Sequence, residues 1–76
     1  MRYFLNIRDG QKLLVDPDGA EFENVEDAIE EARASARDLM AEKLRNGEHV
    51  DGQRFEISDA NGAVVATVVF KDELFF

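Results

Sequence analysis

The stretch from Asn24 to Gly47 constrains this chain most, because its apolar residues recur at intervals of three and four. That spacing places them on one side of an α-helix with its 3.6 residues per turn. The stripe consists of Val25, Ala28, Ile29, Ala32, Ala36, Leu39, Met40 and Leu44. Asn24 is a favourable N-cap, and Asn46-Gly47 can end the helix because both residue types tolerate a positive φ. The sequence therefore predicts one long amphipathic helix over about residues 25–46.

Extended segments lie on both sides of this helix. Alternating or β-branched residues predict strands at about residues 2–8, 12–16, 53–59 and 63–71. Ala20–Phe22 is expected to be a brief extended piece that leads into the helix. Asn61-Gly62 predicts a two-residue type I′ turn between the last two strands, since both central residues of that turn need a positive φ. The resulting register pairs Ile57 with Ala66, and it places Val64, Ala66, Val68 and Phe70 on the core side.

The order strand, strand, helix, strand, strand predicts an α+β fold and a single domain over residues 1–76. We expect a ββαββ two-layer sandwich, with the helix packed on a four-stranded antiparallel sheet. One helix can cover only one face of that sheet. The other face would then carry Phe4, Val65 and Val69, and an apolar tail, Leu74-Phe75-Phe76, ends the sequence. We interpret these six residues as a candidate interaction surface.

Composition excludes several classes of protein. The 76 residues include no cysteine, which removes disulfide scaffolds and thiolate metal sites, and the formal net charge is −8. Direct nucleic-acid binding is disfavoured because it needs a clustered basic face. No run of apolar residues approaches the length of a membrane span, and the N-terminal residues lack a signal-peptide pattern. We therefore expect a cytoplasmic protein whose acidic surface suits a basic protein partner.

No group of residues predicts catalysis. His49 is the only histidine and lies in a polar connector, with no hydroxyl placed to form a triad. Asp16, Asp18 and Gly19 resemble the start of a calcium loop, but Val25 stands where that loop needs glutamate, so a plain turn is expected. We predict no catalytic, cofactor-binding or metal-binding residues. The alternative, a small-ligand or enzymatic domain, predicts an apolar pocket with converging polar groups between helix and sheet.

Taken together, an ordered set of short patterns resembles a family of short uncharacterised alphaproteobacterial proteins, common in rhizobia and defined as a domain of unknown function. These patterns are Tyr3-Phe4, Arg8-Asp9-Gly10, Asp16-x-x-Gly19, Asp27-Ala28, Glu31-Ala32, Asp51-Gly52, Ile57-x-Asp59-x-x-Gly62 and Ala66-Thr67-Val68 with Phe70. The resemblance covers essentially the whole chain. It implies the strand-strand-helix-strand-strand layout and a bacterial cytoplasmic setting, and it implies no activity.

A second resemblance covers residues 1–50. Met1-Arg2-Tyr3, Pro17-x-Gly19 and the run Val25–Ala32 look like the HicB-type antitoxin domain. That resemblance implies an acidic protein that neutralises a small basic ribonuclease toxin. The chain departs from the pattern because a hairpin replaces the usual DNA-binding segment. From the residues themselves we predict a small non-enzymatic interaction protein that forms a homodimer or binds one basic protein partner.

Overall fold

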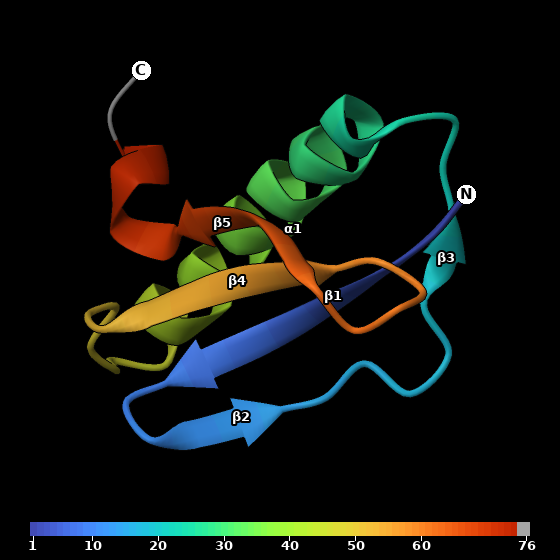
Figure 1. Cartoon of the computed structure of the whole chain (residues 1–76). Coiled ribbons are helices and arrows are strands. Elements are labelled where there is room, and N and C mark those ends of the chain that lie inside the picture. Colours follow the sequence, from blue (N-terminus) through green and yellow to red (C-terminus); the bar gives the residue numbers. More distant parts are fainter. Residues whose placement is uncertain (75–76) are drawn as a thin grey trace.

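The computed structural model describes residues 1–74, and it shows one α-helix packed on one face of an antiparallel sheet (Figure 1). Helix α1 spans Val25–Arg45 and lies between two groups of strands in the sequence. The strands are β1 (Arg2–Asp9), β2 (Lys12–Leu14), β3 (Ala20–Glu21), β4 (Gln53–Ser58) and β5 (Val64–Val69), followed by the 3-10 helix η1 (Phe70–Leu74). The predicted α+β class is confirmed, and the sheet has the order β2-β1-β4-β5.

The core lies between α1 and the sheet. Its buried residues come from β1, α1, β4, β5 and η1, and they are Tyr3, Ala28, Ala32, Ala36, Met40, Phe55, Ile57, Val68 and Phe70. Three of the four buried helical residues are alanines, whose small side chains let the helix axis approach the sheet closely. Leu39 and Leu44 belong to the predicted apolar stripe but are exposed. The buried side of α1 is therefore narrower than its sequence suggests.

Both ends of α1 form as their sequence predicts. The Asn24 side chain accepts a hydrogen bond from the Asp27 backbone N–H at 2.9 Å. At the other end Gly47 has a φ of 75°, and the Glu48 N–H donates to the Lys43 carbonyl at 2.8 Å. The Lys43 carbonyl also accepts from the Asn46 N–H at 3.1 Å, so it is paired twice at the end of the helix.

The turn between β4 and β5 differs from the prediction. Asn61 has a negative φ, so the two-residue type I′ loop does not form. The Asp59 N–H donates instead to the Ala63 carbonyl, the Gly62 N–H donates to the Asp59 carbonyl, and Gly62 alone has a positive φ. This is a longer loop, a type I turn followed by a left-handed glycine. The longer loop moves the Ser58 partner from residue 65 to Val64.

A β-bulge absorbs the extra loop residue. The register shifts between Ile57 and Ser58, and from Ile57↔Ala66 onward it agrees with the prediction. Because of the bulge, Val64 pairs with Ser58 and lies on the face away from the helix, where it is 55% exposed. The prediction that Val64 lies on the core side is wrong.

The sheet also contains one strand more than the four predicted. Ala20–Glu21, expected to be only an extended piece, pairs with the start of β1 as β3. The Phe22 N–H donates to the Met1 carbonyl at 2.8 Å, and the Met1 amino group donates back to the Phe22 carbonyl at 2.8 Å. This exchange extends the pairing by one residue at each strand.

The chain leaves the sheet earlier than predicted, at Phe70. Phe70 is buried as expected, with its ring centroid 5.1 Å from that of Phe55. The next residues form η1, which Glu73 attaches to the helix by accepting from Arg33 at 2.9 Å and from Arg37 at 3.2 Å. The hydrogen bond to Glu73 also raises the pKa of Arg33 above its ordinary value. No helix in residues 1–74 is both long and apolar enough to cross a membrane.

Candidate functional site

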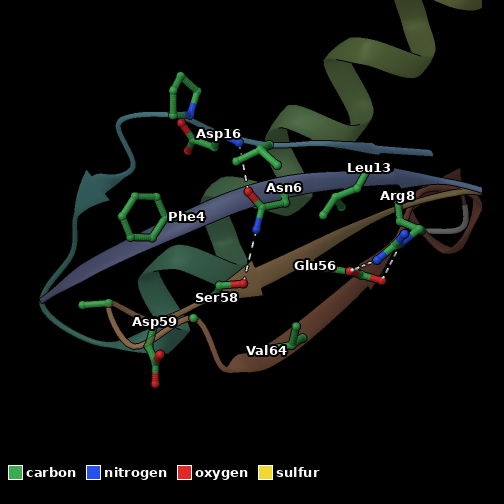
Figure 2. A pocket seen from close by; sticks show the side chains of 13 residues that line it. Phe4, Asn6, Arg8, Leu13, Asp16, Glu56, Ser58, Asp59 and Val64 are labelled. Atoms are coloured by element: carbon green, nitrogen blue, oxygen red, sulfur yellow. Dashed lines mark hydrogen bonds and ion pairs between the residues drawn. The ribbon is translucent and has the colours of Figure 1, made fainter. Parts of the chain in front are cut away.

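The sheet face that α1 leaves uncovered, here called the outer face, contains a shallow open groove of about 480 Å³ (Figure 2). Residues of β1, β2, β4 and the β4–β5 hairpin line it, together with the loop that follows β2. The lining residues are Phe4, Asn6, Arg8, Leu13, Val15, Asp16, Pro17, Glu56, Ser58, Asp59, Ala60, Gly62 and Val64. The groove therefore lies on the side of the sheet away from the helix.

The floor of the groove is a buried hydrogen-bond chain. The Asn6 side-chain amide donates to Ser58 Oγ at 3.2 Å, and its carbonyl oxygen accepts from the Asp16 backbone N–H at 2.9 Å (Figure 2). Asn6 and Ser58 are each 8% exposed. A buried amide and hydroxyl need partners to offset the loss of water. This chain therefore ties β4, β1 and the loop after β2 together.

Asp16 completes one edge of the sheet with its side chain. Its carboxylate accepts hydrogen bonds from the backbone N–H groups of Leu5, Asp18 and Gly19, at 3.2, 3.3 and 3.1 Å. On this edge of β1, β3 covers residues 2–3 and β2 covers residues 7–9. The Asp16 carboxylate fills the interval by bonding Leu5, where neither strand reaches.

Phe4 packs over the loop that Asp16 begins. A Cβ atom built on Gly19 would lie 2.8 Å from Phe4 Cε2 and 2.8 Å from the Tyr3 carbonyl oxygen. Gly19 has a φ of 66°, a conformation that glycine adopts without strain. The close approach of ring and loop fixes one wall of the groove.

A three-residue charge cluster lies at the other end of the groove. Arg8 donates to both carboxylate oxygens of Glu56, at 3.2 and 3.3 Å (Figure 2). Arg54 donates twice to Glu56 Oε2, at 3.2 and 2.9 Å. The hydrogen bonds from Arg8 are the largest cause that lowers the pKa of Glu56 below its ordinary value; partial burial opposes them. Glu56 therefore stays ionised, and its carboxylate is paired with Arg8 and Arg54.

Three apolar side chains that line the groove are, in contrast, exposed to solvent. Leu13, Val15 and Val64 are exposed, at 38%, 65% and 55%, and they lie around the polar floor. Every polar side chain that lines the groove, in contrast, makes at least one hydrogen bond within the chain. The groove thus presents apolar contact area above satisfied polar groups.

Of the six residues predicted as an interaction surface, the four that the structure describes lie at three different places. Phe4 lines the groove and is half-buried. Val65 and Val69 are exposed on β5, where Val69 pairs with Arg54 of β4. Leu74 is exposed in η1 and lines a separate cavity of about 140 Å³ beside α1. Phe75 and Phe76 lie outside the described residues.

Sequence reasoning missed the other apolar residues of the groove. Strand alternation could have identified Leu13, because it lies opposite Arg8 in the first hairpin. No local pattern identifies Val64, whose position depends on the bulge, or Asp16, whose carboxylate reaches back to Leu5.

The remaining candidates stay apart from the groove. His49 is exposed in the connector between α1 and β4. Within residues 1–74 the structure contains no cluster of three or more His, Asp or Glu side chains arranged to hold a metal ion. The cavity beside α1 is lined by Met40, Ala41, Leu44 and Leu74 together with Arg37 and Glu73, and it is separate from the groove on the outer face.

Comparison with known proteins gives a family but no activity. No curated protein and no solved structure shows significant similarity to the chain. One family model matches residues 2–71, nearly the whole sequence, and the strands and helix described above all lie within that match. The chain therefore belongs to the family described as a domain of unknown function, DUF6894.

Proposed function

We propose that this chain is a small non-enzymatic interaction protein that contacts another polypeptide through the outer face of its sheet. One observation carries the proposal. The polar side chains that line the groove already bond within the chain, whereas the apolar side chains of Leu13, Val15 and Val64 are exposed. Apolar area that is exposed around satisfied polar groups is typical of a surface that another chain covers.

The charge distribution supports contact at this face. The charge cluster on the central strands, Arg8, Arg54 and Glu56, has two positive groups against one negative, in a chain of net charge −8. An acidic protein therefore meets less repulsion there than over the acidic remainder of the surface. A basic partner gains further attraction from that remainder, which is the charge relation of the antitoxin-like alternative.

The groove offers little to an acid–base mechanism. A general acid or base must reach substrate with a free proton-accepting or proton-donating group. Glu56 is held charged by two guanidinium groups, and the Asp16 carboxylate accepts from three backbone N–H groups. These side chains stabilise the sheet, and we assign them no catalytic role.

Copurification tests the proposal. We would express the tagged protein and its Val15→Asp variant in the native host and identify what each retains at stoichiometric level. We expect a protein that binds wild type and is lost from Val15→Asp, because a carboxylate in the groove repels apolar contact. Leu44→Asp is the matched control, since Leu44 is similarly exposed but lies beside η1.

The proteins that copurify distinguish the possible partners. A basic ribonuclease among the lost proteins would favour the antitoxin-like alternative, and recovery of the chain alone would favour self-association. Equal retention by wild type and Val15→Asp would contradict a role for the outer face.

A small apolar ligand is the second candidate, and the groove volume favours it. About 480 Å³ lies within the range of ligand sites, ~300–1,000 Å³. Such a ligand should raise the midpoint of thermal unfolding of wild type and not of Val15→Asp, because it would bind only the folded groove. A screen of apolar metabolites by thermal shift measures this directly.

A further inference from the structure

Strand β5 forms one edge of the sheet, and no other described strand pairs with its outward side. β5 lies at the opposite end of the sheet from β2, and its one partner among the described residues is β4 (Figure 1). Its backbone N–H and C=O groups on the other side can therefore pair with a further strand. Such edges are sites of strand addition unless the fold protects them.

The sequence of this edge lacks the usual protection. β5 reads Val-Val-Ala-Thr-Val-Val, with no lysine, no proline and no charge of either sign. Its bulge lies near the first residue, opposite Ile57 and Ser58, and leaves residues 66–69 regular. The protein thus keeps a regular, uncharged edge strand available for pairing.

We propose that β5 pairs with β5 of a second copy, antiparallel and about a two-fold axis at Thr67. The inference goes beyond the proposed function, because it concerns the β5 edge and not the outer face. Antiparallel edge pairing needs the two-fold axis to be perpendicular to the sheet, so both helices lie on the same side. The two outer faces then join into one continuous surface.

The directions of the side chains select this register. Residues directly opposite each other in an antiparallel pair lie on the same face of the sheet. A centre at Thr67 places Thr67 opposite itself, Ala66 opposite Val68, and Val65 opposite Val69. Ala66 and Val68 pair with Ile57 and Phe55, which belong to the core face, so the match is consistent. A centre at Ala66 would oppose Val64 and Val68, which the bulge places on different faces.

The self-complementary edge points to a second copy as the occupant, and its lack of charge lets the two copies approach. Two chains of net charge −8 repel each other, and the uncharged β5 edge is where they can approach with least cost. Both copies bring the same uncharged hydrogen-bonding edge, and the register sets apolar side chains opposite apolar ones with a Thr–Thr pair at the centre. Added salt screens the repulsion between the two copies, so association should strengthen with ionic strength.

The size of the contact sets its strength. A stable interface buries about 800 Å² of solvent-accessible surface on each partner. The accessible surface of this whole chain is 5106 Å². Six residues of strand span roughly 20 Å, so the pairing and its flanking valines supply only part of such an area. We therefore expect reversible association in the micromolar range or weaker.

Cysteine cross-linking tests the register. The chain has no cysteine, so each single variant carries one thiol. In the proposed dimer the two thiols of Thr67→Cys face each other. The thiols of the matched control, Val69→Cys, are about 13 Å apart along the ladder, beyond the ~7 Å limit of a disulfide. Mild oxidation at high micromolar concentration should convert most Thr67→Cys to a disulfide dimer and leave most Val69→Cys monomeric. Equal cross-linking of both variants, or of neither, would overturn the proposal.

A charge variant separates this inference from the proposed function. Thr67 pairs with Glu56 of β4, so Thr67→Lys suits the folded monomer but sets two lysines opposite each other in the dimer. Sedimentation should show salt-strengthened dimers for wild type and monomers for Thr67→Lys, with unchanged circular dichroism. A strictly monomeric wild type would refute the β5 pairing while leaving the Val15→Asp result to decide the role of the outer face. Persistence of the Thr67→Lys dimer would also refute it.

Discussion

Strands β1 and β5 both pair with β4, and their other sides differ in how they are covered. On β1, the strands β2 and β3 and the carboxylate of Asp16 together cover the free edge from residue 1 to residue 9. On β5, no described segment covers the edge and no charge protects it. Three separate segments therefore cover one side of β1. The other edge and the outer face beside it are therefore where we look for partners.

The largest expected effect concerns the loop that closes the β1 edge. Gly19→Ala forces a methyl group to within 2.8 Å of the Tyr3 carbonyl oxygen, a backbone atom that cannot move without disturbing β1. We expect a loss of about 3 kcal/mol in the free energy of unfolding, measured by urea denaturation. Gly10→Ala is the matched control: Gly10 has nearly the same φ, 63°, but open space around its Cβ position. It should cost only about 1 kcal/mol. Equal losses would show that the Phe4–Gly19 contact does not close the edge.

Asp16→Ala tests the carboxylate that replaces a strand. The change leaves the Leu5 N–H, which is partly buried, without its hydrogen-bond partner. We expect a loss of about 2 kcal/mol and faster hydrogen exchange at the Leu5 amide. Asp18→Ala is the control, because only the backbone of Asp18 takes part in this network. If Leu5 exchange is unaffected by Asp16→Ala, the edge is closed by β2 and β3 alone.

Two valines of β5 test whether only the core face of this strand contributes to stability. Val68 is 6% exposed in the core, whereas Val64 is 55% exposed on the outer face. Val68→Ala should cost about 2 kcal/mol, since it leaves a cavity in packed surroundings. Val64→Ala should change the free energy of unfolding by less than about 0.5 kcal/mol in the dilute monomer. A large loss for Val64→Ala would mean that the outer face is part of the folding core.

The smallest effect is expected at the charge cluster of the outer face. Arg8 lowers the pKa of Glu56, so the folded state binds fewer protons here than the unfolded state. The cluster therefore stabilises the protein above the ordinary glutamate pKa of 4.5, and this contribution is lost as the pH falls through the lower folded value. Glu56→Gln should flatten the acid side of the stability curve, as urea denaturation between neutral and acidic pH would measure. Adding Arg8→Met to that variant should change the acid dependence little further, and an additive effect would contradict the pairing.

The sequence predicted the features that depend on nearby residues. The Asn24 cap, the Gly47 stop and the apolar spacing between them specify α1, because each signal acts within a turn or two of helix. Strand alternation likewise gave the outer position of Phe4. The pairing of Ile57 with Ala66 was predicted from the two-residue turn, and it is found because the bulge offsets the longer loop. An uncovered face could also be predicted, because one helix cannot cover both sides of a sheet.

The composition of that face depended on contacts that no short pattern records. Val64 lies outward because a three-residue loop and a bulge together shift its pairing, although the Asn-Gly pair favours a tighter turn. Leu39 and Leu44 are exposed because the alanines bring the helix close along a narrower strip. In each case the packing of the whole sheet decided between two conformations that are similarly acceptable locally.

The sequence by itself therefore determined the helix, the strands and the excess of apolar residues that must lie outside the core. The tertiary structure alone decided where that excess lies: it placed Phe4 in the groove, Val65 and Val69 on β5, and Leu74 beside α1. It also brought the Asp16 carboxylate to the Leu5 N–H, and the Asn6 amide to the hydroxyl of Ser58, which is far away in the sequence. The physical reason is that hydrogen bonds and contacts between distant segments form only when the sheet closes, so local propensities carry no record of them.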